Sequence, residues 1–408
     1  MKFRPYQKNI IKKGVEVIAR RGFLYLAMEV RTGKTLTSLG IAQELRATHV
    51  LFVTKKKAIS SIESDYNLFN PNFLIQVINY ESLHKVSGKF DLIVLDEAHC
   101  LGKFPRPSKR AKQVKALLQK NHPYVILLSG TPTPESYSQM YHQVYAIPSN
   151  PFSIYKNFYR FADRYVKVKQ KMINSVLINM YNEGSELIID QMKPFTISYS
   201  QKEAGFKVKT QESVLHVEMK PTTYELTKRL QKDLVIEGKE EVILADTPVK
   251  LMMKLHQLFS GTVIFESGKS KVLDYTKAEF IRARFKERKV GIFYKFKEEL
   301  EALKCAYGDL LTTDLTEFKE TSKSIALQIV SGREGISLRE AQCLVYYNID
   351  FSATSYWQSK DRMTTKTRLE NDVYWVFASG GIEDQIYKAV TKKKDYTLRH
   401  FKKDLLNL

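Results

Sequence analysis

Short apolar runs alternate with helix-like stretches along the first 147 residues. The runs are rich in Val, Ile and Leu without polar alternation, as expected of strands that crossover helices cover on both faces. They lie at residues 23–28, 50–53, 92–95 and 125–128. Helical periodicity follows the first two runs, at 35–45 and 58–69. This alternation predicts one α/β domain with a parallel sheet over residues 1–147.

The same alternation returns in the second half of the chain. From about Ser270 a long helical stretch leads into apolar runs at residues 290–294, 325–330, 343–347 and 373–378. We therefore expect a second α/β domain within residues 201–408. Residues 148–200 differ because they are aromatic and basic and are punctuated by prolines, so we interpret them as a helical linker or insertion.

Within this insertion, residues 155–165 interleave aromatic side chains with cations. Such a mixture could stack on the bases of a single strand. The aromatic positions 155, 158, 159 and 165 share one helical face with Ala162, however, so a packed amphipathic helix is the favoured interpretation.

The charge balance points to a polyanionic partner. The chain has 65 Lys and Arg against 44 Asp and Glu, a formal charge of +21, which favours nucleic acid. No apolar run of about 18 residues predicts a membrane span. The polar N-terminus and three scattered cysteines, Cys100, Cys305 and Cys343, suggest a reducing, cytoplasmic setting with each cysteine buried as a small apolar residue.

The first candidate for chemistry is a phosphate-binding loop. An apolar run ends at Met28, and Glu29 to Thr35 ends in Gly-Lys-Thr where a helical pattern begins. In this context backbone N–H groups cradle phosphates, Lys34 reaches the β and γ phosphates, and the Thr35 hydroxyl binds Mg²⁺. Met28 stands where the usual motif has its first glycine. We predict nucleotide contacts from Glu29, Thr32, Gly33, Lys34 and Thr35.

A second candidate follows the run at 92–95, which delivers Asp96, Glu97 and His99 to the carboxyl edge of the sheet. Asp96 would hold Mg²⁺, and Glu97 would orient or deprotonate the water that attacks the γ phosphate. A lone histidine does not suggest zinc, so we expect His99 to couple the nucleotide and nucleic-acid sites. The next strand ends in Ser129 to Pro134, whose hydroxyls can bond the acidic motif or a DNA backbone.

Taken in this order, the motifs resemble those of superfamily two DEAD/DEAH-box helicases, and specifically the Swi/Snf-like DNA translocases with their small phage and bacterial relatives. The resemblance covers nearly the whole chain. It implies two RecA-like P-loop NTPase domains joined by the insertion, with ATP and Mg²⁺ as cofactors and DNA as partner. It also implies the opening motif at 4–7, in which Gln7 reads adenine, and a fifth motif at 331–338.

The resemblance assigns roles residue by residue. Catalysis falls to Glu97, Lys34 and Arg362. Further nucleotide contacts are Arg4, Gln7 and Gly335. The coupling residues are His99, Ser129, Thr131 and Gln358. The DNA contacts are Thr54, Lys55, Tyr80, Thr133, Tyr294, Lys295 and Ser331.

The sixth motif departs from the family pattern. Asp361 replaces its glycine and Thr365 its second arginine, whereas Arg362 is retained as a candidate arginine finger. Because a finger contributes roughly 10³–10⁵ in rate, losing the second cation would slow hydrolysis unless Lys366 or Arg368 substitutes.

Three functions remain open from the sequence. The first is an ATP-dependent DNA helicase or translocase in replication, recombination or repair. It would act as a monomer and bind replication or recombination proteins. The second is a duplex translocase that remodels protein–DNA complexes without separating strands. The third is a nucleotide-gated DNA-binding protein with little hydrolysis.

Overall fold

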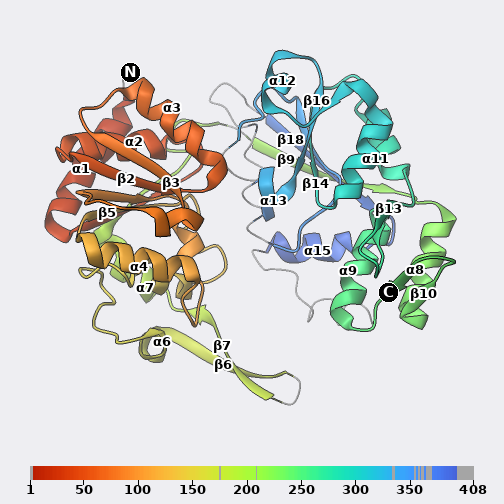
Figure 1. The fold of residues 1–408 in the computed structure, drawn as a ribbon, viewed down its shortest axis with the longest axis horizontal. Coiled ribbons are helices and arrows are strands. Elements are labelled where there is room, and N and C mark those ends of the chain that lie inside the picture. Colours follow the sequence, from red (N-terminus) through yellow and green to blue (C-terminus); the bar gives the residue numbers. More distant parts are fainter. Residues whose placement is uncertain are drawn as a thin grey trace. The chain divides into compact units, whose positions relative to one another are not determined.

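The computed structural model describes residues 3–173, 176–207, 209–332, 336–352, 355–356, 359, 363 and 370–392. The chain divides into two compact units, residues 1–206 and 207–408, and each is an α/β structure built on a six-stranded sheet (Figure 1). The predicted fold class is confirmed in both halves.

The first unit holds a fully parallel sheet. Its strands, in spatial order, are β3 (Leu74–Asn79), β2 (His49–Thr54), β4 (Leu92–Leu95), β5 (Tyr124–Leu128), β1 (Phe23–Met28) and β8 (Thr196–Tyr199). Its α-helices are α1 (Pro5–Arg21), α2 (Lys34–Glu44), α3 (Ile59–Phe69), α4 (Lys109–Asn121), α5 (Met140–Val144), α6 (Phe158–Tyr165) and α7 (Leu187–Met192).

Alternate residues of each strand enter two separate cores. In β1, Phe23 and Tyr25 pack with the helices α4 to α7, whereas Leu24 and Leu26 pack with α1, α2 and α3. Helices therefore cover both faces of the sheet, which explains why its central strands carry no polar alternation. The edge strand β3 is only half buried, with Leu74 65% exposed, so it has no continuous apolar run. For this reason β3 was not predicted from the sequence.

The structure corrects the expected helical linker. Residues 148–200 contain α6 and α7, but their largest feature is an antiparallel hairpin of β6 (Val166–Ile173) and β7 (Val176–Gly184). The segment ends in β8, which pairs with β1 in the first sheet. The hydrogen bonds of β8 make these residues part of the first unit, whose boundary falls after Phe206.

The second unit also has a fully parallel sheet. Its strands, in spatial order, are β15 (Leu311–Thr312), β16 (Ser324–Gln328), β14 (Val290–Tyr294), β17 (Cys343–Tyr346), β18 (Glu370–Ala378) and β9 (Lys209–Val217). Two small antiparallel ribbons accompany it, β10 (Val235–Glu237) with β11 (Val242–Leu244), and β12 (Thr262–Ile264) with β13 (Ser270–Val272). Its α-helices are α8 (Pro221–Asp233), α9 (Pro248–Phe259), α10 (Thr276–Arg284), α11 (Lys297–Tyr307), α12 (Leu315–Glu320), α13 (Ile329–Gly332) and α15 (Glu383–Val390).

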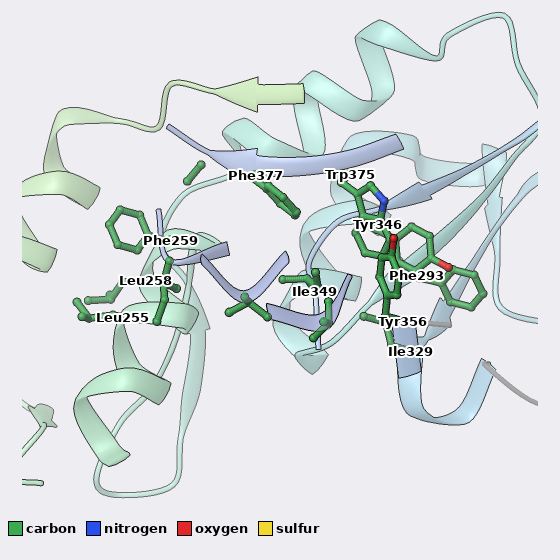
Figure 2. Packing of buried hydrophobic residues seen from close by; sticks show 14 of the residues in the cluster. Leu255, Leu258, Phe259, Phe293, Ile329, Tyr346, Ile349, Tyr356, Trp375 and Phe377 are labelled. Carbon is green, nitrogen blue, oxygen red and sulfur yellow. The ribbon is translucent and has the colours of Figure 1, made fainter. Parts of the chain in front are cut away.

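An aromatic stack occupies one core of this unit. Tyr346 lies flat between Phe293 and Trp375, with ring centroids 5.0 and 3.9 Å away, and Tyr356 continues the stack at 5.3 Å (Figure 2). These rings come from β14, β17, β18 and the segment after β17, so the stack ties the second sheet together.

The cysteines fit the expectation only in part. Cys343 is buried and Cys100 half-buried, but Cys305 is exposed on α11, so burial of all three was wrong. In the described part of the chain, no helix is both long and apolar enough to cross a membrane.

Candidate active site in the first unit

The strand order brings the predicted motifs to one edge. The phosphate loop follows β1, the acidic motif follows β4, and β5 lies between these two strands. Because all the strands are parallel, their carboxyl ends share one edge, so the Ser129–Pro134 loop after β5 lies between the other two loops. A Cβ built on Gly130 would lie 3.4 Å from Lys34 Nζ, which places the ammonium beside this middle loop.

The phosphate loop has the backbone that its glycine predicts. Gly33 has φ +82°, a left-handed conformation, and a Cβ there would lie 2.6 Å from Gln7 Nε2. Thr32 is fully buried, and its hydroxyl donates to the Glu29 carbonyl at 2.7 Å. Lys34 and Thr35 then begin α2. The helix N-terminus and the adjacent N–H groups therefore form the usual anion cradle.

Helix α1 contacts this loop through Tyr6 and Gln7. The Tyr6 hydroxyl donates to the Thr32 carbonyl at 2.9 Å. The amide nitrogen of Gln7 lies 3.4 Å from both Gly33 O and Thr37 Oγ1, and its oxygen accepts the Arg4 backbone N–H at 3.0 Å. Reading adenine would require Gln7, which is buried, to exchange these bonds.

Residues at and just after the end of β8 also contact the phosphate loop, and the sequence did not predict these contacts. Tyr199 stacks on Tyr6 with centroids 4.6 Å apart, and its carbonyl accepts the Glu29 N–H at 3.0 Å. The Gln201 backbone N–H donates to Glu29 Oε2 at 2.7 Å, and its side-chain amide donates to the Val30 carbonyl at 2.9 Å. Glu29, predicted to contact nucleotide, thus binds the segment that ends the first unit.

Asp96 lies at the centre of the acidic motif. The Thr54 hydroxyl donates to Asp96 Oδ2 at 2.8 Å, and the Tyr80 hydroxyl donates to the Asp96 carbonyl at 2.7 Å. Burial, and next the charge of Glu97, raise the pKa of Asp96 to about 6, while the Thr54 bond and the Lys34 charge oppose this rise. A nearby cation would favour the charged form of this partly buried carboxylate.

His99 links the acidic motif to the middle loop. Its Nδ1 lies 3.1 Å from Ser129 Oγ and 3.3 Å from Glu97 Oε2, and Ser129 Oγ also accepts the Thr131 N–H at 3.1 Å. His99 and Ser129 are buried. The structure therefore brings three of the four predicted coupling residues together, and Gln358 lies outside the described residues.

Further positioning of the middle loop comes from a pair that sequence reasoning did not find. The Tyr25 hydroxyl on β1 donates to Gln143 Oε1 at 2.7 Å, and Gln143 Nε2 donates to the Pro132 carbonyl at 2.8 Å. Both residues are buried. A buried polar pair between apolar neighbours was the available signal, although Gln143 sits in α5, far along the chain from Tyr25.

Several predicted DNA contacts are placed differently. Thr54 is fully buried and Tyr80 nearly so, and both hydroxyls bond Asp96, so neither is presented to a DNA backbone. In the second unit, Lys295 is 13% exposed and its ammonium lies 2.9 Å from Asp350 Oδ1 and 3.9 Å from the Phe351 ring centroid. Burial or an ion pair already engages each of the three groups, so contact with DNA would require each of them to exchange its present partner.

The remaining predicted residues are less constrained. Lys55 and Tyr294 lie at strand ends and Thr133 lies in the loop after β5, and all three are half-buried. Gly335 and Arg362 lie outside the described residues, as do Lys366 and Arg368, and Ser331 is described only by its backbone in α13. Their roles stay predictions.

The residues at this edge suit the binding of Mg²⁺ and a nucleoside triphosphate. Mg²⁺ prefers oxygen ligands, and the Thr35 hydroxyl at the start of α2 and the Asp96 carboxylate after β4 belong to the same edge of the sheet, on either side of the Ser129–Pro134 loop. Lys34 supplies the positive charge, and the backbone of Gly33 leaves room for close approach.

Comparisons with known proteins give the family of the chain. The SNF2-related domain family matches residues 42–262, more than half of the chain. This chain belongs to the SNF2-related family. Residues 1–72 also match the res subunit of type III restriction enzymes. The predicted resemblance to Swi/Snf-like ATPases of superfamily two is thereby confirmed.

Several curated proteins are similar over long stretches. A Xenopus laevis protein, "SWI/SNF-related matrix-associated actin-dependent regulator of chromatin subfamily A-like protein 1", is 22% identical over 95% of this chain and 43% of its own length. The Caenorhabditis elegans homologue is 28% identical over 41% of this chain and 26% of its own. This SNF2-related chain thus spans less than half the length of these relatives.

Among solved structures, the "Sulfolobus solfataricus SWI2/SNF2 ATPase core in complex with dsDNA" is similar with a TM-score of 0.44 and 14% identity. The match covers 99% of this chain and 93% of that one.

Proposed function

We propose that this SNF2-related chain is a DNA-dependent ATPase that uses hydrolysis to move along DNA. The observation that supports it most is the convergence of Lys34, the Asp96–Glu97 pair and the Ser129 loop at one edge of the first sheet. A binding protein needs the cradle but does not need an acidic residue to activate water, and here Glu97 follows Asp96 directly.

Each residue has a distinct task in this proposal. Lys34 and the N–H groups at the start of α2 bind the β and γ phosphates, while Thr35 and Asp96 hold Mg²⁺. Bound Mg²⁺ neutralises charge on the transferred phosphoryl oxygens. Glu97 orients the attacking water and accepts its proton.

His99 and Ser129 extend the proposal from chemistry to motion. His99 Nδ1 lies within bonding distance of both Glu97 and Ser129, so a change at the γ phosphate that moves Glu97 also alters the loop carrying Thr131 and Thr133. If that loop contacts DNA, hydrolysis changes the grip on the strand. Arg362 of the second unit is proposed as the arginine finger.

The deciding experiment is steady-state ATP hydrolysis with no nucleic acid, single-stranded DNA, duplex DNA, forked DNA and RNA. We expect stimulation by DNA and its loss in Glu97→Gln, which keeps the shape of the side chain. Equal rates with and without every nucleic acid would contradict the proposal.

A duplex translocase without strand separation is the second candidate, because the family match is to the SNF2-related domain. Displacement of a third strand from a triplex, without separation of a forked duplex, would support it over a helicase. A nucleotide-gated binder is disfavoured by the complete set of Lys34, Thr35, Asp96 and Glu97.

The setting of this activity is part of the proposal. We expect a monomer that acts in the cytoplasm on DNA in replication, recombination or repair, together with the proteins of those processes. Light scattering of the purified chain, with and without DNA, checks the monomer.

A further inference from the structure

The β6–β7 ribbon extends away from the first sheet, and its base is anchored to the rest of the unit (Figure 1). There, Ser138 Oγ donates to the Tyr181 carbonyl at 2.7 Å, and the Ser185 N–H donates to the Tyr165 carbonyl at 2.8 Å. The Tyr181 ring meets Phe158 of α6 edge-on at 5.5 Å. These contacts fix the direction of the ribbon, so its outer half is held out from the unit.

The outer half exposes apolar side chains in the described part of the ribbon. Met172 pairs with Leu177 across the strands, so both lie on one face, and they are 62% and 54% exposed. Ile178, on the opposite face, is 40% exposed. Two-stranded ribbons are marginally stable in water, and a cross-strand apolar pair that stays this exposed contributes only about 0.2–1 kcal/mol to the ribbon. The pair therefore points to a partner.

The ribbon also carries positive charge. Lys167, Lys169 and Lys171 follow one another at every second position of β6. Lys169 forms an ion pair with Glu183, whereas Lys167 and Lys171 have no ion pair within the described residues. Residues 155–184 hold six Lys and Arg against two Asp and Glu. A polyanion complements this surface, and a basic or neutral protein surface does not.

We propose that the outer half of the β6–β7 ribbon enters a groove of duplex DNA. The major groove is about 12 Å wide and admits a two-stranded β-ribbon. Lys171, on the ribbon face opposite to Met172 and Leu177, and Lys167, near the base, then contact phosphates along the edges of the groove. The Met172–Leu177 pair packs against base edges or between base steps. This inference rests on DNA as the track of the proposed function, and names a part of the chain that grips it.

The test uses the full chain with two paired variants and one control. Lys167→Gln with Lys171→Gln removes the charge, and Met172→Ser with Leu177→Ser removes the apolar pair. Lys112→Gln with Lys120→Gln, two exposed lysines of α4 in the same unit, removes equal charge elsewhere. Duplex binding is measured by fluorescence anisotropy over a series of salt concentrations, and circular dichroism checks folding.

We expect the ribbon charge variant to lose about two units of the slope of log K against log salt, since each phosphate contact contributes roughly 0.9. Its affinity should fall about tenfold, while the control keeps the wild-type slope. The apolar variant should bind several-fold more weakly at an unchanged slope. Wild-type affinity and slope in both ribbon variants would overturn the inference, and a protein would then be the expected partner of the ribbon.

The proposed function and the role of the ribbon are tested by separate measurements. ATP hydrolysis by the wild-type chain, with and without duplex, tests the motor, whereas anisotropy reports the ribbon even without hydrolysis. At saturating DNA the ribbon variants should hydrolyse ATP within about twofold of wild type, since the ribbon does not touch the nucleotide loops. Loss of basal hydrolysis in these variants would contradict a purely DNA-binding role.

Discussion

The two units share an architecture but use the ends of their strands differently. In the first, Lys34, Asp96 and Glu97 gather around the loop of Ser129, in the arrangement that phosphate chemistry needs. In the second, the described polar groups at the ends of β14 and β17 bind one another. The same sheet edge is therefore the proposed place of the chemistry in one unit and fixes its own loops in the other.

Glu299, Asn348 and His256 form a buried network in the second unit. Asn348 Nδ2 donates to Glu299 Oε1 at 2.6 Å, and the Lys295 backbone N–H donates to Glu299 Oε2, also at 2.6 Å. His256 Nε2 lies 2.6 Å from Asn348 Oδ1, and burial holds the pKa of His256 well below its usual value. Hydrogen bonds of this kind between buried groups restrain the side chains that make them, although His256 Nδ1 has no partner among the described residues. We interpret it as the frame that holds the loop of Lys295.

The largest expected effect is in the first unit. Lys34→Ala removes the cation that binds the β and γ phosphates, and ATP turnover should fall by about 10³ or more because charge stabilisation is the main source of phosphoryl-transfer catalysis. Steady-state hydrolysis measures it. The exposed Lys112→Ala on α4 is the control, and equal activity in both variants would break the comparison.

The second prediction concerns stability in the second unit. Lys277 Nζ lies 2.6 Å from Glu383 Oε1, and both side chains are fully buried. Glu383→Gln leaves the ammonium unpaired and should cost about 3–5 kcal/mol of unfolding free energy. Chemical denaturation measures it. Replacing both partners, by Lys277→Met with Glu383→Leu, should recover much of that loss, and a cost equal to the single variant would contradict the pairing.

The third prediction separates two roles for Thr54. Thr54→Val removes the hydrogen bond from the hydroxyl to Asp96. It should lower kcat about tenfold and raise the Mg²⁺ concentration needed for half-maximal activity, since a hydrogen bond to a charged group is worth roughly 1.5–3 kcal/mol. Thr54→Ser should restore both. Duplex affinity should not change in either variant; a selective loss of DNA binding would reinstate the original assignment.

The smallest expected effect is at the end of the first unit. Gln201→Ala loses the bond from its side chain to the Val30 carbonyl, so KM for ATP should rise about fivefold with little change in kcat, as expected for a bond worth about 1 kcal/mol. Gln201→Glu cannot donate to that carbonyl and should match Gln201→Ala, whereas Glu203→Gln nearby should resemble wild type. ATP titrations measure this, and an unchanged KM would show that β8 does not support the loop.

Sequence predicted the parts of the fold that rest on continuous apolar runs. The central strands and the positions of Lys34, Asp96 and Ser129 at their ends follow from such runs and from parallel strand order. For Thr54 and Tyr80, the sequence shows that each lies at the end of a strand but not which way its side chain turns, and in the structure both hydroxyls bond Asp96.

Other features had weak or distant signals. The bond of Gln201 to Glu29 spans 172 positions, so no local pattern indicates it. The ribbon did carry a signal, because Val166 to Lys169 alternate apolar and cationic side chains with a period of two. The aromatic, helical pattern just before it dominated the interpretation of the whole segment.

One measurement tests the central claim that the chemistry lies at the sheet edge of the first unit. ATP hydrolysis at saturating duplex DNA is compared between the wild-type chain and Glu97→Gln, with nucleotide binding followed in parallel. We predict that Glu97→Gln binds ATP with near wild-type affinity and hydrolyses it about 10²–10⁴ times more slowly, the range for loss of a general base. Wild-type hydrolysis by Glu97→Gln would contradict the account.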